Sequence, residues 1–270
     1  MDPAFLTELV HAVDRARRGS VVCREDWRTA DIPRGWMAWE PGSDGGEVPS
    51  ASGNRAFWFT AASPLTGEEL RESLRTFRSV GARRMYLFIN PAACPAQTEA
   101  ELGAAGARRW PYVEYPVLVR RASRAAPVRG CEFTTRILSA DDAPGILETG
   151  AHWYSATGIA RAKLMVERGL AEVHAAFDGD RLVAITLFTV DGPWGYLGSA
   201  GTDPAYRGRG AQSALICARV SRAAEQGCGW CISETNTAVK HSLGNLVREG
   251  FEVVLKWRVF RWDDPLTAAG

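Results

Sequence analysis

Residues 206–212 read YRGRGAQ and open a long apolar run, SALICARVSRAAEQG, at residues 213–227. Two glycines and two arginines are an unusual start for a helix, because glycine destabilises helices and arginine is favoured at their C-terminal ends. The first turn of a helix leaves backbone N–H groups unpaired and carries a partial positive charge. Glycines let a ligand approach those groups, and arginines add charge. Residues 206–212, here called the Arg-Gly loop, therefore indicate a site for a phosphorylated ligand, with a pyrophosphate as the best match.

Other phosphate-binding motifs fit the Arg-Gly loop poorly. No Gly-Lys-Ser/Thr follows, so the stretch is not a P-loop. The glycine spacing differs from that of a dinucleotide-binding fold, and three antiparallel strands are expected before it in place of a βαβ unit. The competing interpretation is a basic loop that only caps a helix.

Glycines, prolines and turn sequences around the loop separate a definite series of elements. We expect a strand, two helices, three strands joined by tight turns, the helix of the opening stretch, a strand, a helix and closing strands. These correspond to residues 133–138, 139–153, 159–170, 171–202, 211–226, 230–235, a stretch ending near 249, and 251–262.

The first half of the chain ends with a similar series. A helix, a glycine and a strand occur twice, at Gly81 and Gly106, as they do at Gly227 and Gly250, with spacings of 25 and 23 residues. We interpret this as a degenerate internal duplication. The first copy has SPLTGEEL, residues 63–70, where the second has the Arg-Gly loop, so only the second copy is expected to carry its chemistry.

Composition limits the class of protein. The chain has 270 residues and a net charge of +1, which gives no general attraction to nucleic acid or membranes. No stretch has the length and apolarity of a membrane span, and the first 20 residues indicate an amphipathic helix and not a signal peptide. We therefore expect a cytoplasmic protein whose six cysteines are reduced.

A basic stretch marks the expected domain boundary. Residues 120–130, RRASRAAPVRG, are rich in arginine and small residues, which is typical of an exposed linker. We predict a first domain at residues 1–120, a basic linker at 121–130 and a second domain at 131–270.

The order of elements in the second half resembles the GNAT superfamily of N-acetyltransferases. The family signature is Gln/Arg-x-x-Gly-x-Gly/Ala, and residues 207–211 fit its first five positions, whereas Gln212 departs from the sixth. Gly250-Phe251 matches the pair that usually precedes the family's sixth strand. The resemblance covers residues 131–263, and residues 1–120 resemble a decayed second copy, as in tandem GNAT proteins.

The resemblance implies the fold and the donor. It implies an α/β fold with two GNAT-like domains, each a mixed, mostly antiparallel sheet that is splayed between its fourth and fifth strands and flanked by helices. The donor would be acetyl-CoA or another acyl-CoA, used without a metal, and a primary amine would attack the thioester directly. The residues expected to bind the donor are Ala200, Gly201, Thr202, Arg207, Gly208, Arg209, Gly210, Ala211 and Gln212.

Catalytic residues are less well marked by the sequence. The family's usual tyrosine acid corresponds here to Leu246, which cannot donate a proton, so Asn245 and Ser242 on the same helix are candidates for orienting the thiol or a water. Glu234, at the end of the strand after the splay, is the candidate base. The alternative for these three is an ordinary surface role.

A short aromatic stretch is the candidate acceptor site. The residues His152, Trp153 and Tyr154 fall where the family contacts its acceptor, although core packing would also explain the two aromatic residues. The acceptor would be a small-molecule or peptide amine. Two other functions stay open: an acyltransferase that uses aminoacyl-tRNA as donor, with the basic linker on RNA phosphates, and a non-catalytic CoA-binding or partner-binding module. The sequence leaves the oligomeric state open.

Overall fold

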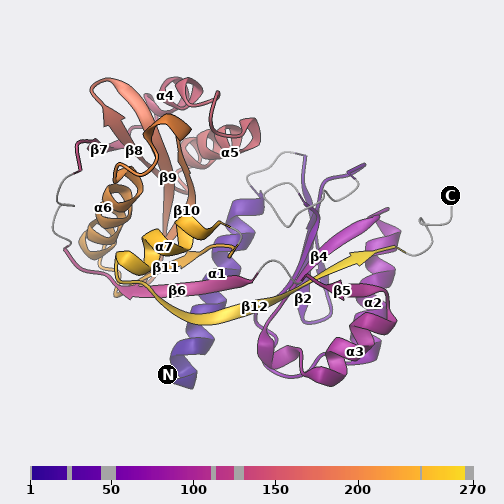
Figure 1. Cartoon of the computed structure of the whole chain (residues 1–270). Coiled ribbons are helices and arrows are strands. Elements are labelled where there is room, and N and C mark those ends of the chain that lie inside the picture. Colours follow the sequence, from indigo (N-terminus) through magenta and orange to yellow (C-terminus); the bar gives the residue numbers. More distant parts are fainter. Residues whose placement is uncertain are drawn as a thin grey trace. The chain divides into compact units, whose positions relative to one another are not determined.

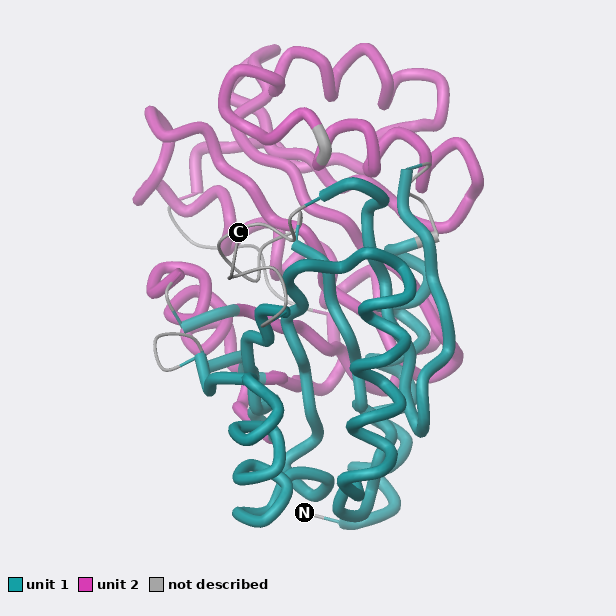
Figure 2. The backbone as a smooth tube through the Cα atoms, turned by 90° about the vertical axis from the view of Figure 1, so that its right-hand side faces the viewer, with its two compact units in different colours: residues 1–116, 236–238, 255–270 teal, residues 117–235, 239–254 magenta. Residues whose placement is uncertain are grey.

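A computed structural model describes residues 2–22, 26–43, 53–110, 114–124, 131–237 and 239–264 (Figure 1). The chain divides into two compact units (Figure 2). Unit 1 comprises residues 1–116, 236–238 and 255–270, and unit 2 comprises residues 117–235 and 239–254. No helix in these described ranges combines the length and apolarity that crossing a membrane requires.

The sheet of unit 2 has six strands in the order β7-β8-β9-β10-β11-β6. All neighbours are antiparallel except β10 and β11, which are parallel. Their bounds are β6 Tyr115–Arg121, β7 Thr134–Leu138, β8 Glu172–Asp178, β9 Arg181–Asp191, β10 Trp194–Thr202 and β11 Trp230–Glu234. The mixed α/β fold expected from the sequence is confirmed.

Four α-helices accompany this sheet among the described residues of unit 2. They are α4 Ala143–Thr149, α5 Ala156–Glu167, α6 Ala211–Glu225 and α7 Lys240–Arg248, with a short 3-10 turn, η2, at Pro204–Tyr206. Apolar side chains of α6 and α7 share a core with Phe188 of β9 and Leu197 of β10. Figure 1 shows α4 and α5 on the other face of the sheet. The parallel β10-α6-β11 connection thus places the start of α6 at the end of β10.

Unit 1 repeats part of this topology. Its sheet has the order β1-β2-β3-β4-β12, with β5 also paired to β12, and only β3 and β4 are parallel. The strands are β1 Arg28–Ile32, β2 Gly35–Trp39, β3 Arg55–Trp58, β4 Arg84–Ile89, β5 Ala107–Arg109 and β12 Glu252–Asp263. The helices are α1 Pro3–Val22, α2 Gly67–Ser79 and α3 Ala96–Ala104, with a 3-10 turn, η1, at Pro91–Ala93. Helix α2 therefore corresponds to α6, which agrees with a degenerate N-terminal copy.

The two units exchange strands, so they do not follow the linear division expected from the sequence. Residues 117–121 of β6, which precede the second half of the chain, pair with β11 in unit 2. Residues 258–263 of β12, at the end of the chain, pair with β4 in unit 1. Arg121, expected in the linker, is the last residue of β6. Residues 125–130 of that linker lie outside the described residues, and the predicted domain bounds stay a prediction.

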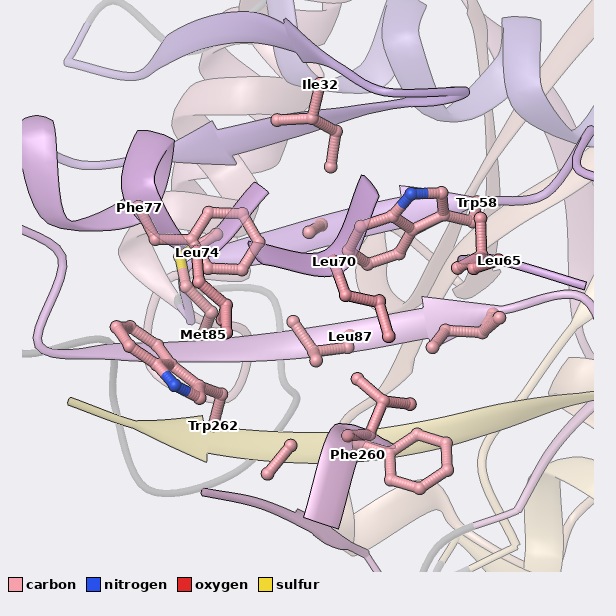
Figure 3. Close-up of a cluster of buried hydrophobic side chains, with 14 of the residues drawn as sticks. Ile32, Trp58, Leu65, Leu70, Leu74, Phe77, Met85, Leu87, Phe260 and Trp262 are labelled. Atoms are coloured by element: carbon pink, nitrogen blue, oxygen red, sulfur yellow. The ribbon is translucent and has the colours of Figure 1, made fainter. Parts of the chain in front are cut away.

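The core of unit 1 shows what holds this copy together. Trp58, Phe77 and Trp262 are at most 1% exposed, and the ring of Phe77 contacts those of Trp58 and Trp262 at centroid distances of 6.5 Å and 5.7 Å (Figure 3). Burying each such side chain contributes about 2–3 kcal/mol. Since Trp262 lies on β12, the last part of the chain completes the core of the first unit.

The start of α2 is closed by the chain's own side chains. The Thr66 hydroxyl accepts a hydrogen bond from the Glu69 backbone N–H at 3.3 Å, and the Glu69 carboxylate accepts one from the Thr66 N–H at 2.7 Å. This capping box satisfies helix N–H groups. The hydrogen bond from the Thr66 backbone holds the pKa of Glu69 below its ordinary 4.5.

Replacing Thr66 tests the capping box. Thr66→Ala is expected to lower the free energy of unfolding by about 1 kcal/mol, because one helix N–H loses its acceptor. Thr66→Ser, which keeps the hydroxyl, is the matched control. The Glu69 carboxylate contributes fully to the free energy of unfolding above its ordinary pKa of 4.5. This contribution is lost as the pH falls through the lower pKa of the folded state. Urea unfolding at pH 7 and pH 3 measures both effects, and equal stability of all three proteins at pH 7 would contradict the prediction.

Candidate functional site

The Arg-Gly loop joins the end of β10 to the start of α6. Asp203 begins the connection, and its carboxylate accepts hydrogen bonds from the Ala205 N–H and the Arg181 guanidinium, both at 3.0 Å. Burial alone would raise the pKa of Asp203, but these two donors bring it below its ordinary value. Asp203 is 4% exposed, so this ionised side chain fixes the loop's first turn from inside.

Two glycines in the left-handed region form the end of the loop. Gly208 has φ +77° and Gly210 has φ +89°, a region that side chains disfavour. Gly210 is the N-cap of α6 and offers no side-chain acceptor. The Ala214 N–H donates to the Gly210 carbonyl at 3.0 Å, so the N–H groups of residues 211–213 precede the first helical hydrogen bond. The helix start is therefore open where that of α2 is closed.

The two arginines of the loop differ. The Arg209 guanidinium pairs with Glu132 at 2.9 Å and lies 5.0 Å from the Phe133 ring centroid and 5.2 Å from that of Tyr206. Its hydrogen bond with Glu132 raises the pKa of Arg209. Arg207 is exposed, and no ion pair joins it to another described residue. A bound anion would meet Arg207 directly, whereas Arg209 would have to leave Glu132.

Gln212, which departs from the family signature, links the loop to β10. Its Nε2 donates to the Gly201 carbonyl and to the Thr202 hydroxyl, both at 2.9 Å. The structure thus brings the predicted donor-binding segments 200–202 and 207–212 together. The side chain of Gln212 supports the backbone of β10, and its own backbone N–H lies in the open first turn of α6.

The paired strands β10 and β11 separate beside this loop. Their parallel pairing extends from Trp194 and Trp230 to Leu197 and Ser233, and beyond Leu197 the structure pairs β10 with β9 alone. The Ser233 hydroxyl donates to the Leu197 carbonyl at 3.0 Å at the last pair. In unit 1 the equivalent strands β3 and β4 stay paired to their last residues, Trp58 and Ile89. Among the described strand pairs, only β10 and β11 are parallel and open at one end.

A β-bulge lies at the point where the strands separate. The pairing of β10 with β9 shifts between Gly198 and Ala200, and Ser199 between them has φ +40°. Arg219 of α6 donates its Nη1–H groups to the carbonyls of Leu187 at 3.2 Å and Gly198 at 3.4 Å. Arg219 is 2% exposed, and burial lowers its pKa to about 9. A buried arginine therefore fixes the bulge, which re-aims the backbone of β10.

The predicted acceptor residues lie against β10. A Cβ on Gly201 would lie 2.3 Å from Tyr154 Cδ2 and 3.4 Å from Trp153 Cζ3, so both rings pack on that glycine. Burial raises the pKa of Tyr154. His152 is mostly exposed, and its Nε2 lies 3.7 Å from Asp203 Oδ2. The structure thus brings Trp153 and Tyr154 to the bulged strand, while His152 faces the base of the Arg-Gly loop.

The candidate catalytic residues fall into two groups. Glu234 ends β11, and its Oε2 accepts a hydrogen bond from the Tyr196 hydroxyl of β10 at 2.7 Å. On α7, Leu246 is 4% exposed and lies in the core, Asn245 accepts a hydrogen bond from Arg248 at 3.0 Å, and Ser242 is half-buried. The structure therefore places Glu234 beside the end of β10, whereas Asn245 is engaged on its own helix.

Sequence reasoning missed three side chains of this site. They are Tyr196, Arg219 and Arg161, whose Nη2 donates a hydrogen bond to the Ser199 hydroxyl at the bulge. Arg219 did leave a signal, since it is a charged residue inside an apolar helical run. Arg161 and Tyr196 lie in sequences typical of an ordinary helix and an ordinary strand, so nothing in the sequence marked them as site residues. Among the described residues, no group of His, Cys, Asp or Glu could hold a metal ion.

Two arginines of the basic stretch 120–130 have structural roles in unit 2. Arg120 donates a hydrogen bond to the Glu249 carbonyl, and the guanidinium of Arg121 lies 4.0 Å from the ring centroid of Trp230. Both interactions hold β6 in the sheet of unit 2. These contacts give Arg120 and Arg121 a structural role that does not require binding to RNA phosphates.

Residues 142–243 match the acetyltransferase (GNAT) family. This segment includes β10, the Arg-Gly loop, α6 and β11, and its recognition as a GNAT domain is confirmed. No curated protein matches the sequence significantly.

Several solved structures share the fold along nearly the whole chain. A GCN5-related N-acetyltransferase from Kribbella flavida is 14% identical, with a TM-score of 0.65 over 96% of this chain and 95% of that one. A tandem GNAT protein from the clavulanic acid biosynthesis pathway is 12% identical, with a TM-score of 0.64 over 91% and 87%. A conserved protein of unknown function from Staphylococcus epidermidis is 9% identical, with a TM-score of 0.60 over 87% and 92%. At these identities the likeness concerns the fold, and it includes the tandem arrangement.

Proposed function

We propose that unit 2, which contains the GNAT domain, transfers an acyl group from acyl-CoA to a primary amine. The observation that carries this proposal is the separation of β10 from β11 after Leu197 and Ser233, directly beside the open start of α6. An extended chain with a phosphorylated end fits this arrangement, because the free edge of β10 can pair with amides and the helix start can bind phosphate.

The donor's pyrophosphate would lie on the backbone N–H groups of residues 208–212. Arg207 would contribute charge from solvent, and Arg209 would contribute it by exchanging Glu132 for phosphate. The pantetheine would extend along residues 200–202 of β10, on the strand edge that is not paired with β9. Unit 1 lacks both features among its described residues, because α2 is capped by Thr66 and Glu69 and β3 stays paired with β4. We therefore propose one donor site per chain, in unit 2.

The chemistry that fits this geometry is direct transfer without an acyl-enzyme. The amine nitrogen attacks the thioester carbonyl, a C–N bond forms, and the C–S bond breaks to release the thiolate. Backbone N–H groups at the bulge would stabilise the negative charge on the carbonyl oxygen. Glu234, hydrogen-bonded to Tyr196, would accept the ammonium proton directly or through water. The thiolate would then be protonated from solvent or through a water held by Ser242 or Asn245.

The finer parts of the proposal are an acetyl donor, a small-molecule or peptide acceptor and a cytoplasmic location. Cys94, Cys217, Cys228 and Cys231 are buried free thiols, which is compatible with the reducing environment of the cytoplasm. No metal is required by the proposed steps, since protein N–H groups polarise the carbonyl.

Thermal unfolding followed by a turnover assay tests the proposal. Acetyl-CoA at about 100 times its Kd is expected to raise the free energy of unfolding by about 2.7 kcal/mol, because only the folded loop binds it. A panel of primary amines, with thiol release as the readout, is then expected to include an acceptor. Desulfo-CoA, which lacks the thioester, is the control that should stabilise without turnover. No stabilisation by acetyl-CoA would contradict the donor, and stabilisation without turnover on any amine would favour the non-catalytic binding module.

A further inference from the structure

Arg161 of α5 is a charged side chain beside β10. The proposed chemical steps do not use it. Its Nη2 donates a hydrogen bond to the hydroxyl of Ser199, the bulge residue of β10. Ser199 has φ +40°, which is unfavourable for a residue with a side chain. Strained backbone of this kind persists only where its surroundings hold it, and it is concentrated at functional sites. Because it contacts Ser199, the Arg161 guanidinium lies at the bulge, just beyond the last residue of β10 that pairs with β11.

Tyr154 lies beside the same guanidinium. Burial raises the pKa of its hydroxyl overall, although Arg161 and Ser199 both act to lower that pKa. Its ring is fixed between two glycines, since a Cβ on Gly201 would lie 2.3 Å from the ring and one on Gly158 would lie 2.5 Å from it. Two glycines on separate elements thus leave room for a single tyrosine, which packs on β10.

The two hydroxyl groups beside Arg161, those of Ser199 and Tyr154, carry no negative charge. A hydroxyl accepts a hydrogen bond from a guanidinium but contributes no negative charge. Burial raises the pKa of Tyr154, so its phenol stays protonated at neutral pH even though Arg161 acts to lower that pKa. The positive charge of Arg161 is therefore not cancelled by a phenolate beside the bulge.

A negative charge lies on the same face of the sheet. Side chains two residues apart on a strand share a face, and the Tyr196 ring lies 3.2 Å from the position of a Cβ on Gly198. The Tyr196 hydroxyl donates to Glu234 at 2.7 Å. The bulge thus has a carboxylate on its β11 side and a guanidinium on its α5 side.

We infer that Arg161 binds a carboxylate of the acceptor, so that the acceptor is an amine that also carries a carboxylate. The inference rests on the proposed function and specifies its substrate class. The planar guanidinium matches a carboxylate with two parallel hydrogen bonds, and it already donates a hydrogen bond to Ser199. The amine would then lie toward Glu234, beside the thioester carbonyl at the bulge. Arg161 would be a specificity-determining residue, and Ser199 and Tyr154 would position it.

Matched pairs of acceptors test this inference. 4-Aminobutyrate against 4-aminobutanamide, and glycine against glycinamide, differ in the carboxylate while both members keep a primary amine. We expect at least one pair in which the full-length protein with acetyl-CoA shows kcat/KM about tenfold or more higher for the carboxylate, mainly through KM. Arg161→Gln is expected to remove this preference, because it lowers kcat/KM for the carboxylate by about tenfold more than for the amide.

Two further variants separate charge from structure. Arg161→Lys keeps the charge without the planar fork, so it should retain part of the preference, and it serves in place of Arg161→Gln should that variant not fold. Arg168→Gln removes an exposed arginine at the end of the same helix and should leave the preference unchanged. Melting temperatures of all the proteins report on folding.

The outcomes distinguish this inference from the proposed function. Turnover with equal efficiency on carboxylates and amides would overturn the inference and leave the proposed function standing. A carboxylate preference that survives in Arg161→Gln would overturn the role of Arg161. Absence of turnover on every amine would overturn both.

Discussion

Gly210→Asp is expected to weaken the binding of acetyl-CoA by about 100-fold or more, which corresponds to about 2.7 kcal/mol. Gly210 is the N-cap of α6, and a Cβ there would lie 3.9 Å from that of Cys131, an ordinary contact. The introduced carboxylate would therefore fit, and it would accept hydrogen bonds from the N–H groups of the first turn, as Thr66 does in α2. Those donors would no longer be available to phosphate, and the added charge would repel it.

The same substitution is expected to leave the protein folded. Aspartate and asparagine tolerate the left-handed conformation better than other side chains, and both are good N-caps. The cost of φ +89° and the gain from capping then nearly cancel, so the free energy of unfolding should change by about 1 kcal/mol or less. Isothermal titration with acetyl-CoA and urea unfolding measure the two quantities separately.

Two control variants isolate the effect of the charge at the helix start. Gly210→Asn introduces the same size and strain without the charge, so it should weaken the donor less than Gly210→Asp does. Gly227→Asp introduces the same side chain at φ +79° just after α6, where a Cβ meets nothing within 4 Å, and it should leave donor binding unchanged. Equal donor affinity in Gly210→Asp and the unmodified protein would rule out the Arg-Gly loop as the phosphate site.

Arg219→Ala is expected to lower the free energy of unfolding by about 2–4 kcal/mol. The Arg219 guanidinium donates to the carbonyls of Leu187, Gly198 and Leu215, and alanine would leave buried acceptors without this donor. The lost packing of its aliphatic part adds to the cost. Removing a buried charge offsets part of it, which is why the expected loss is below the sum of these effects.

Arg222→Ala is the matched control for Arg219→Ala. Arg222 lies on the same helix, but its side chain is 29% exposed and pairs with Glu172 at 2.6 Å. Its removal should cost about 1 kcal/mol or less, because water can solvate both charges. Urea unfolding compares the variants. Equal losses in the two would show that the bulge does not depend on the buried guanidinium, and a small loss in Arg219→Ala with normal turnover would show the same.

Local features of this chain could be predicted from its sequence because they depend on nearby residues. Gly208 and Gly210 indicated a helix start whose backbone a ligand can approach, and in the structure both have positive φ and no side chain caps α6. The order of strands and helices in the second half, and the contrast between SPLTGEEL and YRGRGAQ, were also readable. A cap, a turn or a glycine conformation is decided within a few residues, and so the sequence contains the information.

Other features needed the tertiary structure because they join residues far apart in the chain. Which strand lies beside β11 or β4 is set by long-range pairing, and several apolar strands of similar composition could have satisfied either edge. The linear domain prediction therefore missed the exchange of β6 and β12. The same holds for Tyr196 with Glu234, 38 residues apart, and for Arg161 with Ser199, also 38 residues apart.

The sequence by itself predicted a glycine-rich, basic helix start in the second half of this chain and a helix start without that motif in its first. Only the tertiary structure decided that β10 separates from β11 beside that helix start, that a buried arginine fixes the bulge, and that opposite charges lie on one face of it. The physical reason is that backbone conformation is set by adjacent residues, whereas burial, strand pairing and the juxtaposition of charges arise only when distant segments pack together.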